Sequence, residues 1–286
     1  MLLAEFIRDG IARLETLYPS PEARGLVLML LAEKLGTTSY THIIEPRTAV
    51  PEERQAELEN DLRRLCSGEP IQYVLGVAEF CGHRFAVGPG VLVPRPETEL
   101  LVARSVRFLR ELELDRPPRV LDLCTGSGCI AWSIALEIRD AQVVGVDWSE
   151  AALRYAPGQF PTEDGSPVFL QADVLDTEQD FPFGPFDLIV SNPPYVRESE
   201  RAQMQPNVLD YDPALALFVP DDDALRFYRA IGDIAHRHLA SGGLLAVEIN
   251  EALADKTAAL LNEKGFNPTI HTDFRGKPRW ITATLH

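Results

Sequence analysis

Residues 119–130 read RVLDLCTGSGCI, and this stretch indicates the fold class of the chain. Residues 120–123 are largely apolar, as in a buried strand, and the pair Gly126 and Gly128 allows a tight turn with close approach of the backbone. The residues after the pair continue at helical spacing, and Ala131 stands where the relaxed dinucleotide fingerprint accepts a small residue. A strand, a glycine turn and a helix in this order favour a nucleotide-binding α/β unit, although a Gly-x-Gly pair alone is a weak signal.

Two later strand-like runs end at acids. Residues 142–146 are followed by Asp147, and residues 168–172 by Asp173. Asp147 lies about 20 residues beyond the glycine turn, where an acid binds ribose hydroxyls in this architecture. Taken alone, Asp147 is equally well explained as a helix cap, because Ser149 and a glutamate follow it. Because ligands bind at the carboxyl ends of the strands in open α/β sheets, the ordered series predicts one ligand crevice.

A further apolar run, residues 186–190, leads into a turn with the sequence Asn192-Pro193-Pro194-Tyr195. The two prolines have no backbone N–H, so the turn presents carbonyl acceptors that no helix or ladder easily claims. With the asparagine oxygen before them and an aromatic ring after them, the turn suits a planar NH2 group. It therefore favours chemistry on an amide or exocyclic nitrogen, whereas in isolation it is also typical of an ordinary proline-rich turn.

Charge and composition narrow the class of partner. The 286 residues include 43 acidic and 27 basic side chains, a formal net charge of −16, which disfavours direct binding to a nucleic-acid backbone. The sequence has no Gly-Lys-Ser/Thr phosphate loop, so a nucleoside of modest charge is predicted rather than a nucleoside triphosphate. Its apolar runs are too short to span a bilayer, and its four cysteines lack metal-ligand spacing. We expect a cytoplasmic protein with reduced cysteines, bound neither to a membrane nor to a metal.

Together these features resemble class I S-adenosylmethionine-dependent methyltransferases. Within that class the chain is similar to the HemK/PrmC-type protein-(glutamine-N5) methyltransferases, which modify the glutamine of the Gly-Gly-Gln loop in peptide chain release factors. The resemblance covers most of the chain, and adenine, cytosine and guanine amino-methyltransferases share only the Asn-Pro-Pro-Tyr turn. More specific are GEPIQYVLG at residues 68–76 and VPRPETE at 93–99, and PALAL at 213–217 also fits.

The resemblance and the residue pattern imply one organisation. We expect an α/β fold with a seven-stranded, mostly parallel Rossmann-like methyltransferase sheet, a small N-terminal helical domain and a linking β-hairpin. Helical apolar periodicity over the first part of the chain supports a helical domain at residues 1–75. We expect this domain to dock the substrate. A hairpin linker is expected at residues 76–95 and the methyltransferase domain at 96–286. By resemblance, the last strand runs antiparallel between its two neighbours.

The resemblance also implies a cofactor, S-adenosyl-L-methionine, lying over the glycine turn. Asp147 is then expected on its ribose hydroxyls and Asp173 towards its adenine amino group. The implied cofactor-binding residues are Asp122, Cys124, Thr125, Gly126, Ser127, Gly128, Asp147, Asp173, Val174 and Asn192. The implied catalytic residues are Asn192, Pro193, Pro194 and Tyr195, and no metal is implied. The Asn192 oxygen and the Pro193 carbonyl are expected to accept hydrogen bonds from the target glutamine NH2, with Tyr195 against the amide plane.

Two positions depart from the family pattern. Cys124 stands where many members carry glycine, and a Cys-Thr-Gly-Ser-Gly-Cys turn is familiar in the branch that methylates a glutamine of a ribosomal protein. Val174 stands where an aromatic residue beside the adenine is expected. Release factors are the preferred substrate and a monomer is expected. The alternatives are a ribosomal-protein glutamine methyltransferase, a nucleic-acid amino-methyltransferase of the adenine N6 type, and a cofactor-binding scaffold without catalysis.

Overall fold

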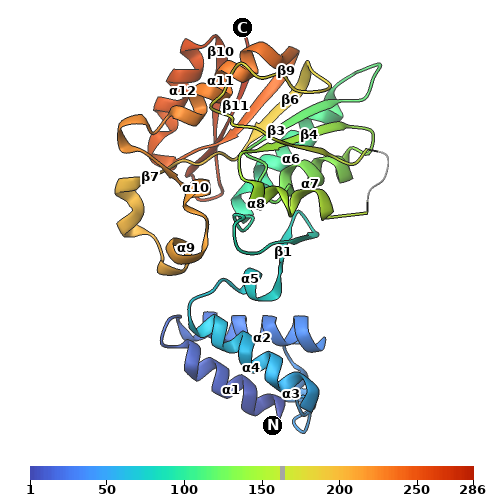
Figure 1. Cartoon of the computed structure of the whole chain (residues 1–286), viewed down its shortest axis with the longest axis vertical. Helices are drawn as coiled ribbons and strands as arrows, with labels where there is room; N and C mark the ends of the chain where they lie inside the picture. The colour runs from blue at the N-terminus through green and yellow to red at the C-terminus, as the bar shows by residue number, and fades with distance from the viewer. Residues whose placement is uncertain (162–164) are drawn as a thin grey trace. The chain divides into compact units, whose positions relative to one another are not determined.

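The structure is a computed structural model, and it describes residues 1–161 and 165–286 (Figure 1). By its internal contacts the chain divides into two compact units. The first unit consists of Met1–Val77 and Gln205–Tyr211, and the second consists of Ala78–Met204 and Asp212–His286. The short segment Gln205–Tyr211 thus packs with the first unit although it lies far along the chain from the rest of that unit.

The first unit is helical and has a core of its own. Its helices are α1 (Leu3–Leu14), α2 (Ser20–Leu35), α3 (Thr41–Ile44), α4 (Glu52–Cys66), α5 (Ile71–Leu75) and α9 (Pro206–Tyr211). Phe6, Leu30 and Leu62 project from three of these helices into one buried apolar cluster. At Gly10 an added Cβ would stand 3.0 Å from a methyl of Val27, so the absence of a side chain lets α1 approach α2 closely. The predicted N-terminal helical domain is confirmed.

A small sheet of two strands, β1 (Val77–Phe80) and β2 (His83–Ala86), follows in the chain. Phe80 and Phe85 are buried and meet edge to face, with ring centroids 6.1 Å apart. Both rings belong to the same core cluster as α6 (Pro96–Glu111) and α7 (Cys129–Glu137). The predicted hairpin is therefore confirmed.

The described residues of the second unit form a seven-stranded sheet in the order β10-β11-β9-β6-β3-β4-β5. The strands are β3 (Arg119–Leu123), β4 (Gln142–Asp147), β5 (Val168–Gln171), β6 (Phe186–Ser191), β9 (Leu239–Glu248), β10 (Phe266–Thr272) and β11 (Pro278–Leu285). The pairs among β5, β4, β3, β6 and β9 are parallel, and β11 runs antiparallel to both of its neighbours. The predicted sheet and the reversed last strand are confirmed.

Helices cover both faces of this sheet (Figure 1). The helices and short elements that complete the unit are α8 (Glu150–Leu153), α10 (Ala214–Leu217), α11 (Arg226–His238), α12 (Ala254–Glu263), η1 (Ala156–Gly158), η2 (Glu198–Gln203), η3 (Asp221–Asp223), η4 (Glu251–Leu253), β7 (Val196–Arg197) and β8 (Phe218–Val219). Side chains of β6 alternate between the faces: Ile189 packs with α11 and α12, and Val190 with α6 and α7. Both faces are buried, as parallel sheets require.

The strand register brings the predicted site residues to one edge of the sheet. Leu123 of β3 pairs with Val146 of β4 on one side and with Ser191 of β6 on the other. After β3 the chain proceeds to β4 and β5, and then returns to the opposite side of β3 as β6. Such a reversal of strand order opens a crevice at the carboxyl ends of the strands, which is where α/β sheets bind ligands.

Gly145 lets β4, β5 and the glycine turn pack closely. A Cβ there would stand 2.6 Å from ring atoms of Phe169 and 2.8 Å from Thr125 Oγ1. We expect Gly145→Ala to lower the free energy of unfolding of the second unit by about 1–3 kcal/mol, because overpacking displaces these neighbours. Urea unfolding followed by tryptophan fluorescence measures this, since Trp132, Trp148 and Trp280 all lie in that unit.

The matched control is Gly158→Ala in the same unit. A Cβ at Gly158 meets nothing within 4 Å, so this variant should be neutral or stabilised by up to about 1 kcal/mol. Equal stability of the two variants would contradict the close packing assigned to Gly145.

Candidate active site

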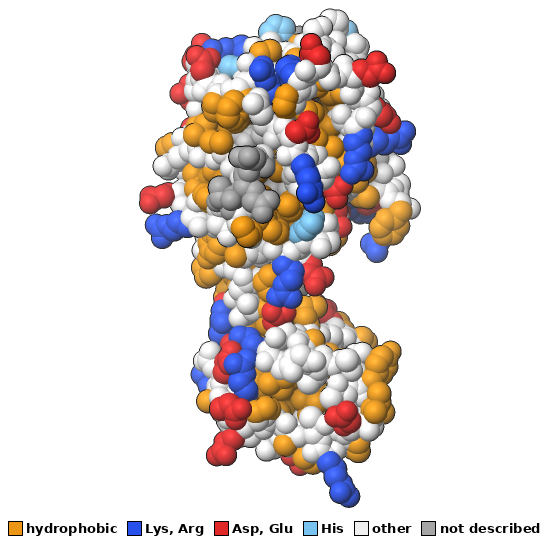
Figure 2. Space-filling view, turned by 90° about the vertical axis from the view of Figure 1, so that its right-hand side faces the viewer, with side chains coloured by type: hydrophobic (Ala, Val, Ile, Leu, Met, Phe, Trp, Pro, Cys, Tyr) orange, Lys and Arg blue, Asp and Glu red, His pale blue; other side chains and the backbone are white. Residues whose placement is uncertain are grey.

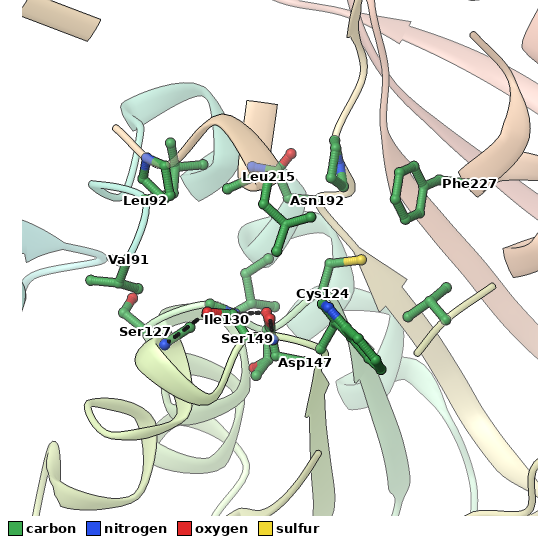
Figure 3. Close-up of a pocket in the computed structure, with 18 of the residues that line it drawn as sticks. Val91, Leu92, Cys124, Ser127, Ile130, Asp147, Ser149, Asn192, Leu215 and Phe227 are labelled. Atoms are coloured by element: carbon green, nitrogen blue, oxygen red, sulfur yellow. Dashed lines mark hydrogen bonds between the residues drawn. The ribbon is translucent and has the colours of Figure 1, made fainter. Parts of the chain in front are cut away.

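The carboxyl ends of β3, β4 and β6 open onto one pocket in the second unit (Figure 3). Of the predicted site residues, those that line it are Cys124, Thr125, Gly126, Ser127, Asp147, Asp173, Val174, Asn192 and Pro194. Four others, Asp122, Gly128, Pro193 and Tyr195, lie outside its lining. The structure therefore brings the glycine turn, both acids and the Asn-Pro-Pro-Tyr turn to one place, with some members behind the surface.

Asp122 is the predicted binding residue that lies deepest. It is fully buried, and its Oδ2 accepts hydrogen bonds from Thr125 Oγ1 at 2.5 Å and from the Ala131 N–H at 3.2 Å. These donors come from the glycine turn and from the first turn of α7. The carboxyl group thus ties the turn to the helix from beneath.

Burial raises the pKa of Asp122 to about 7, against the partial opposition of the Thr125 and Ala131 donors. Between about pH 4 and pH 7 the unfolded chain loses a proton that the folded chain keeps, so this group's contribution to stability falls as pH rises. Asp122→Asn cannot ionise. The free energy of unfolding of the parent should fall as the pH is raised from about 5 to about 8. In the variant we expect this fall to be smaller by roughly 2–3 kcal/mol.

Urea titrations at the two pH values, again followed by tryptophan fluorescence, measure this difference. An identical pH dependence in the Asp122→Asn variant and the parent would show that the raised pKa is wrong.

Asp147 joins β4 to the glycine turn. Its Oδ2 accepts from the Gly126 N–H and its Oδ1 from the Ser149 N–H, each at 2.8 Å (Figure 3). Burial raises its pKa, and these backbone donors pull it back down. The cap of α8 is Ser149, whose Oγ accepts from the Ala152 N–H at 3.2 Å. The alternative explanation of Asp147 as the N-cap of the following helix is therefore wrong, because Ser149 is that cap.

The Asn192–Tyr195 turn is held from behind by buried polar groups. The Asn192 side-chain NH2 donates to Thr98 Oγ1 at 3.1 Å, and the Tyr195 hydroxyl donates to Glu248 Oε1 at 2.9 Å. The Tyr195 carbonyl accepts from the side-chain NH2 of Asn250 at 3.0 Å. The turn is thus fixed in place before any ligand is bound.

Asp173 and Val174 follow β5 at the same edge of the sheet. The Asp173 Oδ1 accepts from the Leu175 N–H at 2.9 Å, which orients its carboxylate. Val174 is buried and lines the pocket. Aromatic rings enter the lining from other places: Trp148 directly after β4, and Phe227 in α11. The aromatic surface expected at position 174 is therefore present in the pocket on other elements.

The part of the chain that the structure describes offers neither a cluster of metal ligands nor a membrane-spanning helix. There, no group of three or more His, Cys, Asp or Glu side chains could hold a metal ion. Residues 1–161 and 165–286 also contain no helix of the length and apolarity needed to cross a membrane.

Similarity to known proteins identifies the family to which this chain belongs. Residues 5–76 match the family described as the PrmC N-terminal domain, and residues 103–209 match the Methyltransferase small domain. A release factor glutamine methyltransferase of Bacteroides thetaiotaomicron is 40% identical over 282 residues, which cover 98% of this chain and 98% of that protein. The chain belongs to the release factor glutamine methyltransferase family. The resemblance found in the sequence is confirmed.

A second release factor glutamine methyltransferase, from Flavobacterium psychrophilum, is 35% identical and covers 100% of both chains. Among solved structures, the hMettl16 catalytic domain superposes with a TM-score of 0.52 over 71% of this chain and 76% of that chain. At 12% identity this likeness shows the fold alone. The predictions of an enzyme of the methyltransferase class and of a Rossmann-like fold are thus confirmed.

The backbone at Cys124 accounts for the glycine that the resemblance found in the sequence leads us to expect at this position. Cys124 has φ of +61°, a left-handed conformation that glycine adopts without the steric cost a side chain incurs. Its sulfur points into the pocket near Asn192 (Figure 3). Burial raises the pKa of this thiol well above its ordinary value, so the group stays protonated.

Several lining residues of this family member were not predicted from the sequence. They are Val91, Leu92, Thr98, Trp148, Leu215, Arg226 and Phe227, among others. Trp148 had a usable signal, because it directly follows the predicted ribose acid. Thr98 and Leu215 lie in the motifs at 93–99 and 213–217 that carried the family resemblance. Val91, Leu92, Arg226 and Phe227 reach the pocket from segments before β3 or after β6, and their spacing in the sequence carries no indication of that.

Proposed function

We propose that the chain transfers the methyl group of S-adenosyl-L-methionine to the side-chain amide nitrogen of a glutamine in peptide chain release factors. Relatives bearing the name release factor glutamine methyltransferase match it over its whole length, including both units. By the resemblance noted from the sequence, the target is the glutamine of the Gly-Gly-Gln loop. The observation that carries the proposal is the Asn192–Tyr195 turn, held in place at the edge of the pocket that the glycine turn and Asp147 also line.

The pocket residues fit this cofactor. A Cβ at Gly126 would meet only Val91 at 3.9 Å, so the bare backbone leaves room for a ligand that presses against the turn. Both Asp147 oxygens accept backbone hydrogen bonds, and a carboxylate has about four lone-pair sites, which leaves acceptor capacity for a ribose hydroxyl. Trp148 is 57% exposed and lines the pocket, which gives a flat apolar surface for the adenine. Asp173 is then the acceptor for the adenine amino group.

When bound, S-adenosylmethionine supplies a methyl group on a positively charged sulfur. The glutamine nitrogen is a poor nucleophile because its lone pair is delocalised into the carbonyl. The Asn192 oxygen and the Pro193 carbonyl accept the two N–H hydrogens and hold them out of the amide plane, which localises the lone pair and aims it at the methyl carbon. Tyr195 holds the amide from its face.

Held by the glycine turn and Asp147, the cofactor would supply the methyl carbon, and its sulfur would keep the bonding electrons as the new carbon–nitrogen bond forms. The nitrogen becomes acidic and loses one proton to solvent, so no strong general base is needed. The Cys124 thiol is close to this chemistry, and because burial raises its pKa it presents no thiolate to compete for the methyl group. The chain's contribution is positioning and preorganised acceptors.

The test is mass spectrometry of a purified release factor incubated with the protein and S-adenosylmethionine. We expect a gain of one CH2 on the glutamine of the Gly-Gly-Gln peptide, and no gain on a release factor in which glutamate replaces that glutamine. An unmodified release factor after prolonged incubation would refute the proposed substrate.

The same assay with radiolabelled cofactor separates the other candidate substrates. Ribosomal proteins, DNA, ribosomal RNA and transfer RNA are offered in parallel, and we expect label only in the release factor. The net charge of −16 supports a protein substrate over nucleic acid. On the face shown in Figure 2, basic side chains are interspersed with acidic ones, without the continuous basic area that a phosphate backbone favours.

A further inference from the structure

Glu248 is a buried carboxylate at the end of β9, next to the catalytic turn. In the sheet, Ser191 of β6 pairs with Val247 of β9, so the next residues, Asn192 and Glu248, lie side by side. Glu248 is 4% exposed, and its two carboxylate oxygens have separate donors. Thr98 Oγ1 donates to Oε2 at 2.6 Å, and the Tyr195 hydroxyl donates to Oε1 at 2.9 Å. The mechanism described above does not use Glu248 or Thr98.

The direction of these hydrogen bonds sets the orientation of Asn192. A carboxylate only accepts, so the single hydroxyl proton of Thr98 points to Glu248. The Thr98 oxygen can then only accept, and its partner is the side-chain NH2 of Asn192 at 3.1 Å. If the Asn192 amide were turned over, its oxygen would need the Thr98 proton, and a buried carboxylate oxygen would lose its donor. Leaving a buried charged acceptor unpaired is costly, so the chain of bonds disfavours the turned-over amide.

We propose that Glu248 and Thr98 are positioning residues that fix the Asn192 amide with its oxygen directed to the substrate. This inference rests on the proposed function, in which that oxygen accepts a hydrogen bond from the target glutamine. Through its second oxygen Glu248 also anchors the Tyr195 ring, so one carboxylate sets the geometry of both side chains that grip the amide. Thr98 belongs to α6, Asn192 and Tyr195 to the turn after β6, and Glu248 to the end of β9. The hydrogen bonds among these side chains therefore lie where the three elements meet.

The location of Thr98 suits this task. It is the third residue of α6 and is 2% exposed, so its side chain is fixed by packing. Its hydroxyl lies between Asn192 and Glu248, and Thr98 itself reaches the pocket lining. Removing only the hydroxyl therefore breaks the connection while the helix and the pocket wall remain.

The test compares Thr98→Val, which has nearly the same shape without a hydroxyl, with Thr98→Ser, which keeps it. We expect Thr98→Val to lower kcat for release factor methylation by about tenfold or more, with the Kd of S-adenosylmethionine changed by less than about twofold. Thr98→Ser should recover most of that loss. The matched control is Thr257→Val, which removes from α12 an equally buried hydroxyl that donates to the Leu253 carbonyl of η4, and this variant should keep the kcat of the parent.

A second readout does not depend on methyl transfer. In the parent protein, NMR hydrogen exchange of the Asn192 side-chain NH2 should be slowed by its bond to Thr98, and Thr98→Val should abolish that protection. If Thr98→Val fails to fold, as judged by tryptophan fluorescence, Thr98→Ala takes its place, because it leaves space for water beside Glu248.

The outcomes separate the two proposals. An inactive parent protein with a protected Asn192 NH2 that Thr98→Val releases would overturn the proposed function and uphold only the orientation of the Asn192 amide by Thr98 and Glu248. An active parent whose kcat and NH2 protection are unchanged in Thr98→Val would overturn the positioning role alone. A fall in kcat equal in Thr98→Val and Thr257→Val would also overturn it, since the loss would then come from a general effect of losing a buried hydroxyl.

Discussion

Asn192→Ala should lower kcat for glutamine methylation by about 10³-fold, because preorganised acceptors and donors at a reacting group each contribute effects of that order. The variant loses the side-chain oxygen that holds one amide hydrogen, and the target NH2 can then lie flat in its plane. The Kd of S-adenosylmethionine should change by less than about threefold, since the proposed cofactor contacts come mainly from the glycine turn and Asp147. Single-turnover kinetics and calorimetric titration measure the two quantities separately.

Asn262→Ala is the matched control for this variant. Asn262 lies in α12, and its side chain donates to the Phe266 carbonyl at 3.5 Å, away from the residues that line the pocket. It should keep the kcat of the parent. If Asn192→Ala kept a kcat close to that of the parent, the Asn192 side chain would have no part in methyl transfer. If the variant lost only affinity for the cofactor, Asn192 would contribute to cofactor binding alone.

The succession of strands along the chain and the pocket at their carboxyl ends were predictable because they depend on local patterns. Apolar runs, the glycine turn and the Asn-Pro-Pro-Tyr turn each report on a few consecutive residues. Parallel strands bring their carboxyl ends to one edge, so the run that ends at Asp147 and the run that ends before Asn192 had to converge once the sheet was inferred.

The direction and partners of single side chains were not predictable in this way. Asp122 lies between Leu121 and Leu123 of β3, and these two leucines face the core cluster of α11 and α12. Because side chains alternate along a strand, Asp122 points to the other face, beneath the turn and towards α7. The sequence shows an acid there, but only the fold places α7 on the face of the sheet to which this acid points.

The contacts behind the catalytic turn join residues far apart in the chain. Thr98 and Glu248 are separated by 150 positions, and Asn192 lies 94 positions from Thr98. In the sequence Thr98 belongs to a helix start and Glu248 to a strand end, and each has an ordinary structural explanation there. Only the packing of α6 against the ends of β6 and β9 makes them neighbours.

Asp147→Ala should weaken S-adenosylmethionine binding by about 10²-fold or more, because hydrogen bonds to a charged acceptor contribute about 1.5–3 kcal/mol each. The variant loses the proposed acceptor of the ribose hydroxyls. It also loses the bonds to the Gly126 and Ser149 N–H groups, so a weaker Kd alone does not distinguish a ribose contact from a reshaped turn.

A double comparison resolves the two effects. The Kd of S-adenosylhomocysteine and that of its 2′,3′-dideoxy analogue are measured by calorimetry on the parent and on Asp147→Ala. If Asp147 holds the ribose, the parent should prefer the natural nucleoside by about 10²-fold, and the variant should bind both forms about equally, since the hydroxyls have lost their acceptor. If the parent and the variant preferred the natural nucleoside to the dideoxy analogue by the same factor, the carboxylate would act only by organising the backbone. The proposed contact between Asp147 and the ribose would then be wrong.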